Sequence, residues 1–183
     1  FRAPGFDPYQ IDDVLVTRDG DREQLWIATY GNGLWRLDAD GLVSWRESTG
    51  ALDSDLLYTM ATTRAPDGES VLWVATRRGL ARIKGDSVQN FSRQHGLPSD
   101  VMRNVQVWRS PDGIDVLWVA TEAGVARALA NASQWHTASL MGARGNGVFG
   151  LALEPDGAGG ERLWVSASMD GVGRYQQGRW SRY

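Results

Sequence analysis

The sequence has no cysteine and only two histidines among its 183 residues. Without cysteine there are no disulfides and no thiolate metal sites, and the two histidines have no spacing typical of a metal site. The formal net charge is −3, so no basic field favours a nucleic-acid partner. No apolar run approaches the ~20 residues that a membrane-spanning helix needs, and no long segment has helical periodicity. We therefore expect no cofactor, no metal, no nucleic acid and no direct membrane insertion by this segment.

Tryptophan is abundant, with nine copies, and glycine occurs 22 times. The word Leu-Trp-Val-Ala-Thr, or a close variant, recurs at a period of 47, 45 and 46 residues. Its copies begin at Leu25, Leu72, Leu117 and Leu163. A five-residue word held at such a period indicates an internal structural repeat.

Each copy of the word predicts the first strand of a β-hairpin. β-Branched and aromatic residues suit a pleated surface, and a glycine follows where the turn needs a positive φ. These glycines are Gly33, Gly79, Gly124 and Gly171. A further short strand on each side, set off by Asp-Gly or similar turns, completes four antiparallel strands per unit.

Four strands in a unit of this length are typical of a β-propeller blade. We expect an all-β chain, residues 1–183 forming one propeller segment, with blades at about 7–46, 55–92, 100–136 and 147–183. Propellers have ~4–8 blades, so four units close a small ring or form part of a larger one. The chain starts at Phe1 rather than methionine, as expected of a processed or trimmed piece. Because an open half-ring would leave an apolar face at each end, we expect further blades of the same chain, or a second copy, to complete the ring.

Packed blades would bury both faces of the repeated word. Leu72 and Val74 should point to one side, and Trp73 and Ala75 to the other. Each buried indole removes ~150–250 Å² from water, so equivalent tryptophans should wedge successive blades together. The last strand of each unit is expected to place an aromatic residue at Trp45, Phe91, Trp135 and Trp180. Trp35 and Trp108 do not recur and are the candidates for a role outside the core.

An arginine also recurs at one strand position, as Arg36, Arg82, Arg127 and Arg174. A repeated position indicates a repeated structural role. We expect these arginines to pair with acids of the loops, such as Asp7, Asp55 or Asp100.

A ligand should contact residues that break the repeat. In a propeller, the turn inside the hairpin and the loop between units lie on one face, around the central axis, and binding residues gather on such loops. The variable polar residues there are the candidate ligand-binding residues: Tyr30, Asn32, Arg77, Arg78, His95, Glu122, Arg144, Asn146 and Asp170.

The third unit carries the fullest set of motifs: Gly-Leu-Pro-Ser-Asp-Val at 96–101, Pro-Asp-Gly at 111–113, and Leu-Trp-Val-Ala-Thr followed by a glycine turn at 117–127. It resembles the two-component regulator propeller repeat family. The resemblance implies the extracytoplasmic sensor half of a bacterial membrane signalling protein, whose output module is a histidine kinase or a cyclic-dinucleotide enzyme. It implies a periplasmic location and a small-molecule or oligosaccharide ligand.

Two other functions stay open. One is a protein–protein interaction platform, a common use of propellers. The other is an enzyme similar to streptogramin lyases, which need a histidine base and a bound metal. Because the chain offers few histidines, we expect no catalytic residues and a non-catalytic role.

Overall fold

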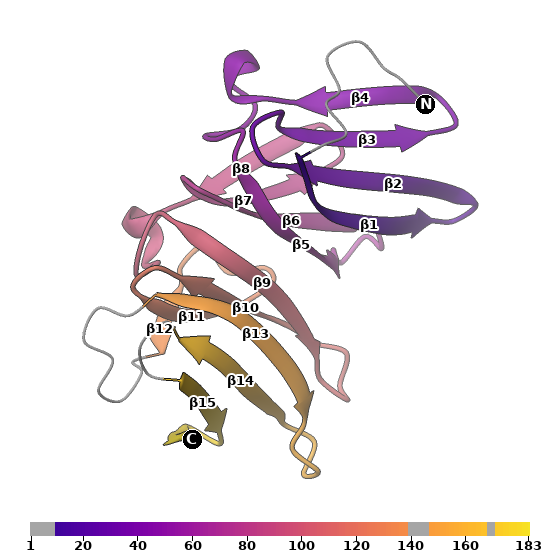
Figure 1. Ribbon diagram of the computed structural model, residues 1–183. Coiled ribbons are helices and arrows are strands. Elements are labelled where there is room, and N and C mark those ends of the chain that lie inside the picture. Colours follow the sequence, from indigo (N-terminus) through magenta and orange to yellow (C-terminus); the bar gives the residue numbers. More distant parts are fainter. Residues whose placement is uncertain (1–9, 139–146, 168–170) are drawn as a thin grey trace.

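The structure is a computed structural model that describes residues 10–138, 147–167 and 171–183. Its strands form four sheets, and each sheet contains four strands that pair antiparallel in chain order. This confirms the all-β class and the four blades expected from the repeat (Figure 1). The two described helical turns are short 3-10 turns, Glu47–Thr49 and Arg93–His95, between blades.

The strands are named in chain order, four to a blade. The first blade contains β1 (Ile11–Asp19), β2 (Arg22–Thr29), β3 (Leu34–Asp38) and β4 (Gly41–Trp45). The second contains β5 (Leu57–Arg64), β6 (Ser70–Thr76), β7 (Gly79–Lys84) and β8 (Ser87–Phe91). The third contains β9 (Met102–Arg109), β10 (Asp115–Thr121), β11 (Gly124–Leu129) and β12 (His136–Ala138). The fourth contains β13 (Val148–Pro155), β14 (Glu161–Ala167), β15 (Gly171–Gln176) and β16 (Arg179–Arg182).

The blades fan out around their first strands. β1 contacts β5, β5 contacts β9, and β9 contacts β13. Figure 1 shows the first and last blades at opposite ends of this fan. Side chains tie neighbouring first strands together, since Asp13 accepts a hydrogen bond from the Met60 N–H at 2.7 Å and Thr59 accepts one from the Val105 N–H at 3.0 Å. The first strands therefore line the axis of the propeller.

Three apolar clusters fill the spaces between blades, and all follow one rule. The Trp-x-Ala side of the repeated word in one blade packs against the Leu-x-Val side of the word in the next. Trp73 and Ala75, for example, share a cluster with Leu117 and Val119, whereas Leu72 packs back against the first blade. The opposed directions expected for these side chains are confirmed.

Burial of the repeated tryptophans follows from the same rule. Trp73 and Trp118 are 0% exposed and Trp26 is 5% exposed, whereas Trp164 in the last blade is only half-buried. Trp35 and Trp108 also serve packing. Trp35 is buried and its indole N–H donates to the Asn32 carbonyl at 3.0 Å, and Trp108 packs against the cluster between the third and fourth blades.

The aromatic residue expected in the last strand of each blade is found at Trp45, Phe91 and Trp180, but the expectation is wrong for Trp135. Trp45 and Phe91 do pair with equivalent residues of β3 and β7. Trp135, however, precedes β12, which runs on to Ala138. It reaches back to the second blade, with its ring 6.1 Å from that of Phe91. In the fourth blade Trp180 lies in β16 and pairs with Tyr175, whereas Tyr183 takes the place opposite the start of β15, with its N–H bonded to the Val172 carbonyl at 2.9 Å.

The recurrent arginines have a repeated structural role, as expected, but the described residues do not pair them with Asp55 or Asp100. Each arginine lies directly opposite the tryptophan of the repeated word, in the pairs Trp26–Arg36, Trp73–Arg82, Trp118–Arg127 and Trp164–Arg174. Each guanidinium lies 5.6–5.8 Å from that ring's centroid, within cation–π range. Asp55 and Asp100 instead accept hydrogen bonds from the backbone N–H groups of Glu47 and Arg93, and Asp7 lies outside the described residues.

The threonine of the repeated word closes the hairpin turn. The Thr76 hydroxyl donates to the Gly79 carbonyl at 2.9 Å and accepts from the Arg78 N–H at 3.1 Å. Thr29 and Thr121 make the same pair of bonds. Gly79 adopts a φ of 116°, and a Cβ there would lie 2.5 Å from the Phe91 carbonyl oxygen. The glycine in this turn is thus required by both conformation and space.

Candidate functional site

An irregularity recurs at the start of each blade's first strand. The pairing register shifts between Ile11 and Asp13 in β1, between Leu57 and Met60 in β5, opposite Thr121 in β9, and between Val148 and Gly150 in β13. A β-bulge of this kind adds one unpaired residue and redirects its side chain. Because these strands line the axis, the bulges place four side chains at one mouth of the propeller.

The bulge position holds a different residue in every blade: Asp12, Tyr58, Arg103 and Phe149. The repeated word keeps nearly the same residues in all four blades, so this divergence sets the position apart from the core. We call these four residues, together with Tyr30 and Glu122, the axial cluster.

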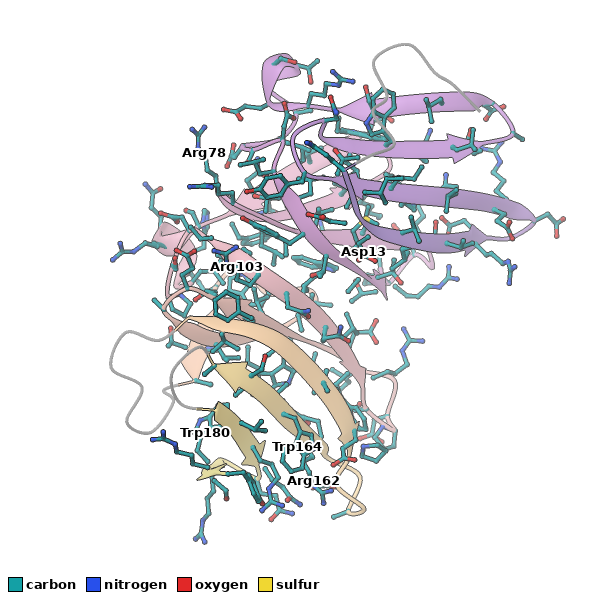
Figure 2. All side chains as sticks on the ribbon, viewed as in Figure 1. Asp13, Arg78, Arg103, Arg162, Trp164 and Trp180 are labelled. Carbon is teal, nitrogen blue, oxygen red and sulfur yellow. The ribbon has the colours of Figure 1, made fainter. Side chains whose placement is uncertain are left out.

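Arg103 is the centre of the axial cluster. Its guanidinium lies 5.0 Å from the ring centroid of Tyr58 and 5.5 Å from that of Phe149, and it forms an ion pair with Glu122. Tyr30 packs edge-on against Tyr58, with ring centroids 6.1 Å apart. Several blades thus contribute to one contiguous group of side chains. Figure 2 shows Arg103 near the start of β9, on the same side of the molecule as Arg78.

The axial cluster is accessible to solvent. Phe149 is 49% exposed and Tyr30 is 40% exposed, while the Arg103 side chain is 26% exposed. Partial burial, together with the charge of neighbouring Asp13, raises the pKa of Asp12. The exposed rings offer stacking surfaces, and the guanidinium, fixed in place by its ion pair, offers hydrogen-bond donors. Groups of these two kinds can bind a small polar ligand.

The predicted candidates divide into four groups. Tyr30 and Glu122 belong to the axial cluster. Arg78 pairs at 2.6 Å with Glu47 of the 3-10 turn between the first two blades, and it lines a cleft of about 700 Å³ on the same loop face. Arg144, Asn146 and Asp170 lie outside the described residues.

The remaining candidates are placed in the loops. Asn32 forms the first hairpin turn through its backbone, and Arg77 is exposed, its N–H bonded to the Leu56 carbonyl. The His95 imidazole caps its own turn, with Nδ1 accepting the Ser92 N–H at 3.0 Å. None of these three contacts the axial cluster in any described interaction.

Sequence reasoning missed Asp12, Tyr58, Arg103 and Phe149, because they lie inside strands rather than in loops. Alignment of the four units would have shown one strand position whose residue type changes each time. That signal was present, but it becomes meaningful only when the bulge turns the position toward the axis.

The opposite face of the fan carries a cleft of about 760 Å³ between the first two blades. Its lining is rich in acids, including Asp21, Asp40 and Asp86. Within the described part of the chain, no three histidine, cysteine or acidic residues are grouped so that they could hold a metal ion. Among the described residues, no helix is long and apolar enough to cross a bilayer.

Comparison with known proteins adds evidence on the fold. No family model matches the sequence, and no curated protein matches it. Two solved structures of an extracellular domain from B. thetaiotaomicron are similar in fold to this chain. One names the protein as a putative one-component system and the other as a putative hybrid two-component system. They give TM-scores of 0.65 and 0.64 at 17% identity, covering 92% of this chain. The chain spans less than a quarter of their length, 23% and 22%.

Enzymes share the architecture as well. Virginiamycin B lyase from Staphylococcus aureus has a TM-score of 0.60 at 16% identity, with 94% of this chain and 55% of that chain covered. A thermostable family-43 glycoside hydrolase has a TM-score of 0.58 at 10% identity, with 95% of this chain and 72% of that chain covered. At these identities the comparisons establish the fold alone.

Proposed function

We propose that this chain is a ligand-binding segment of a sensor propeller, which acts outside the cytoplasm as part of a membrane signalling protein of the two-component or cyclic-dinucleotide type and performs no catalysis. The observation that carries the proposal is the axial cluster, where one bulged position presents a different side chain from every blade. The resemblance of the third unit to two-component regulator propellers supports the signalling role, and so does the fold shared with the extracellular domain of a hybrid two-component system.

The ligand that fits the axial cluster is small and polar. Tyr30, Tyr58 and Phe149 offer ring faces or edges to the apolar side of a sugar, and Arg103 offers guanidinium hydrogen bonds to its oxygens. Because Glu122 holds Arg103 in place, little side-chain entropy is lost on binding.

A binding screen tests the proposal. The chain should be titrated calorimetrically with mono- and oligosaccharides and with other small periplasmic metabolites. A compound that binds should lose about tenfold or more in affinity on Arg103→Ala and on Phe149→Ala, since each removes a contact worth about 1–3 kcal/mol. Arg22→Ala, an exposed arginine of β2, is the matched control and should leave binding unchanged. Binding that ignores both cluster variants would exclude the axial cluster as the site.

A polypeptide partner is the second candidate, favoured by the exposed aromatic rings of Tyr30 and Phe149. It predicts that Phe149→Ala abolishes capture of a peptide while the sugar panel shows no heat. The enzyme alternative is favoured by the fold shared with a lyase and a glycoside hydrolase. It predicts turnover of a glycoside or of virginiamycin B, and metal in the purified protein for a lyase of the streptogramin type. Our proposal predicts neither turnover nor stoichiometric metal.

A further inference from the structure

In each internal interface, the Trp-x-Ala face of one blade packs against the Leu-x-Val face of the next blade. At the two ends of the fan, one face of each type has no neighbouring blade among the described residues. The first blade ends the fan with the Leu-x-Val type of face, formed by Leu25 and Ile27. The last blade ends it with the Trp-x-Ala type of face, formed around Trp164 and Arg174. Figure 2 shows Trp164 on the blade at one end of the described fan.

Both end faces leave apolar surface exposed. On the first blade, Val14 and Val16 lie opposite Ile27 and Leu25 and are 57% and 51% exposed. On the last blade, Tyr183 is 64% exposed and its ring lies 5.4 Å from that of Trp164. Contiguous exposed apolar surface of this kind marks an interaction site in a soluble protein.

A polar position at the edge of each Leu-x-Val face bonds to the preceding blade in all three internal interfaces. Ser70 donates its hydroxyl to Asp19 at 2.7 Å, and Asp115 accepts from the Arg64 N–H at 3.1 Å. Glu161 accepts from Arg127 at 2.9 and 3.1 Å. The equivalent residue of the first blade is Glu23, which is 59% exposed and pairs only within its own sheet, with Arg18, among the described interactions.

The last blade carries an arginine that can serve as a partner for Glu23 from another blade. Arg174 is the equivalent of Arg127, and its Nε is buried with no hydrogen-bond partner among the described residues. Arg127 uses its own Nε to bind Glu161 of the next blade. The donor at one end of the fan and the acceptor at the other are therefore matched in type and position.

We propose that the Trp164 face of this chain docks on the Leu25 face of a second copy of the chain, and that Arg174 of one copy binds Glu23 of the other. The contact is head-to-tail, so two copies that make it twice close a ring of eight blades, within the range of ~4–8 that propellers adopt. The axial mouth is then lined by bulge residues from both copies.

The mass of the purified chain tests the proposal. Sedimentation velocity and light scattering should give twice the chain mass of 20.1 kDa. Arg174→Glu and Glu23→Arg should each raise the dimer dissociation constant about tenfold or more, because each sets like charges against one another in the contact. The double variant with both changes should restore the dimer. Arg22→Glu, one residue away but on the other face of β2, should have no effect.

A variant at an already exposed position separates docking from folding. Val16→Asp should leave the circular dichroism spectrum and the unfolding midpoint of the monomer unchanged while abolishing the dimer, since Val16 is 51% exposed. A chain that stays monomeric at high concentration would overturn the proposal and assign these faces to another occupant. So would a dimer that is insensitive to Val16→Asp and to both charge reversals.

Discussion

Trp73 and Arg82 stand directly opposite each other on β6 and β7, and the guanidinium lies 5.8 Å from the centroid of a fully buried indole. The same pair occurs in every blade, so one cross-strand contact is repeated four times. The arginine places its charge over the ring face, where the electron-rich ring attracts a cation. This explains why an arginine recurs at a position that faces the next blade.

Substitution of Arg82 should therefore destabilise the second blade. We expect Arg82→Gln to lower the free energy of unfolding by about 1 kcal/mol, since the glutamine keeps part of the stem but loses the cation–π contact. Urea unfolding followed by tryptophan fluorescence measures it. Arg77→Gln, in the adjacent exposed turn, is the control and should change stability by less than about 0.5 kcal/mol. Equal effects of the two variants would refute a specific role for the Arg82–Trp73 pair.

Substitution of the hairpin threonine should also lower the free energy of unfolding. Thr76→Val keeps the shape of the side chain but removes the hydroxyl that bonds the Gly79 carbonyl and the Arg78 N–H. Because the site is buried, we expect a loss of about 1–3 kcal/mol. Thr137→Val serves as the control, since Thr137 is exposed and its one described side-chain bond is 3.3 Å long. Thermal unfolding of the two variants compares their stabilities, and Thr76→Val should unfold at the lower temperature. Equal unfolding temperatures would contradict the role assigned to Thr76.

Asp115 predicts a dependence of stability on pH. Burial by itself would raise the pKa of this carboxyl, but the hydrogen bonds from Arg109 and from the Arg64 N–H outweigh it, so the pKa is lowered. A lowered pKa in the folded state contributes stability above the ordinary aspartate value near 3.8, and that stability is lost as the pH falls through the folded pKa.

The measurement for Asp115 is unfolding free energy against pH. Asp115→Asn should be less stable than the parent protein at pH 7, and the gap should shrink as the pH falls below about 4, where the parent carboxyl also protonates. Asp112→Asn, in the exposed turn nearby, should leave the curve unchanged. A gap between parent and Asp115→Asn that stays constant down to the lowest pH would contradict the assignment.

The amino-acid sequence by itself determined the blades. Successive side chains of Leu-Trp-Val-Ala-Thr point to alternate sides of the strand, so the order of residues alone assigns both faces of β6. The period at which the word recurs predicts four units. Local signals suffice here, because side-chain direction in a strand depends only on the order of residues. The interaction of the word's threonine with its glycine turn is likewise a short-range matter.

Only the tertiary structure decided which residues meet. The partner of Arg127 is Glu161, 34 positions along the chain, and no local pattern encodes that distance. Trp135 keeps the sequence period but lies outside β12, because β11 pairs with His136–Ala138 instead. The axial cluster depends on bulges in β5, β9 and β13, and a bulge exists only through the register between paired strands. Tyr58, Arg103 and Phe149 come together because three blades pack around one axis, a relation that no single stretch of the chain contains.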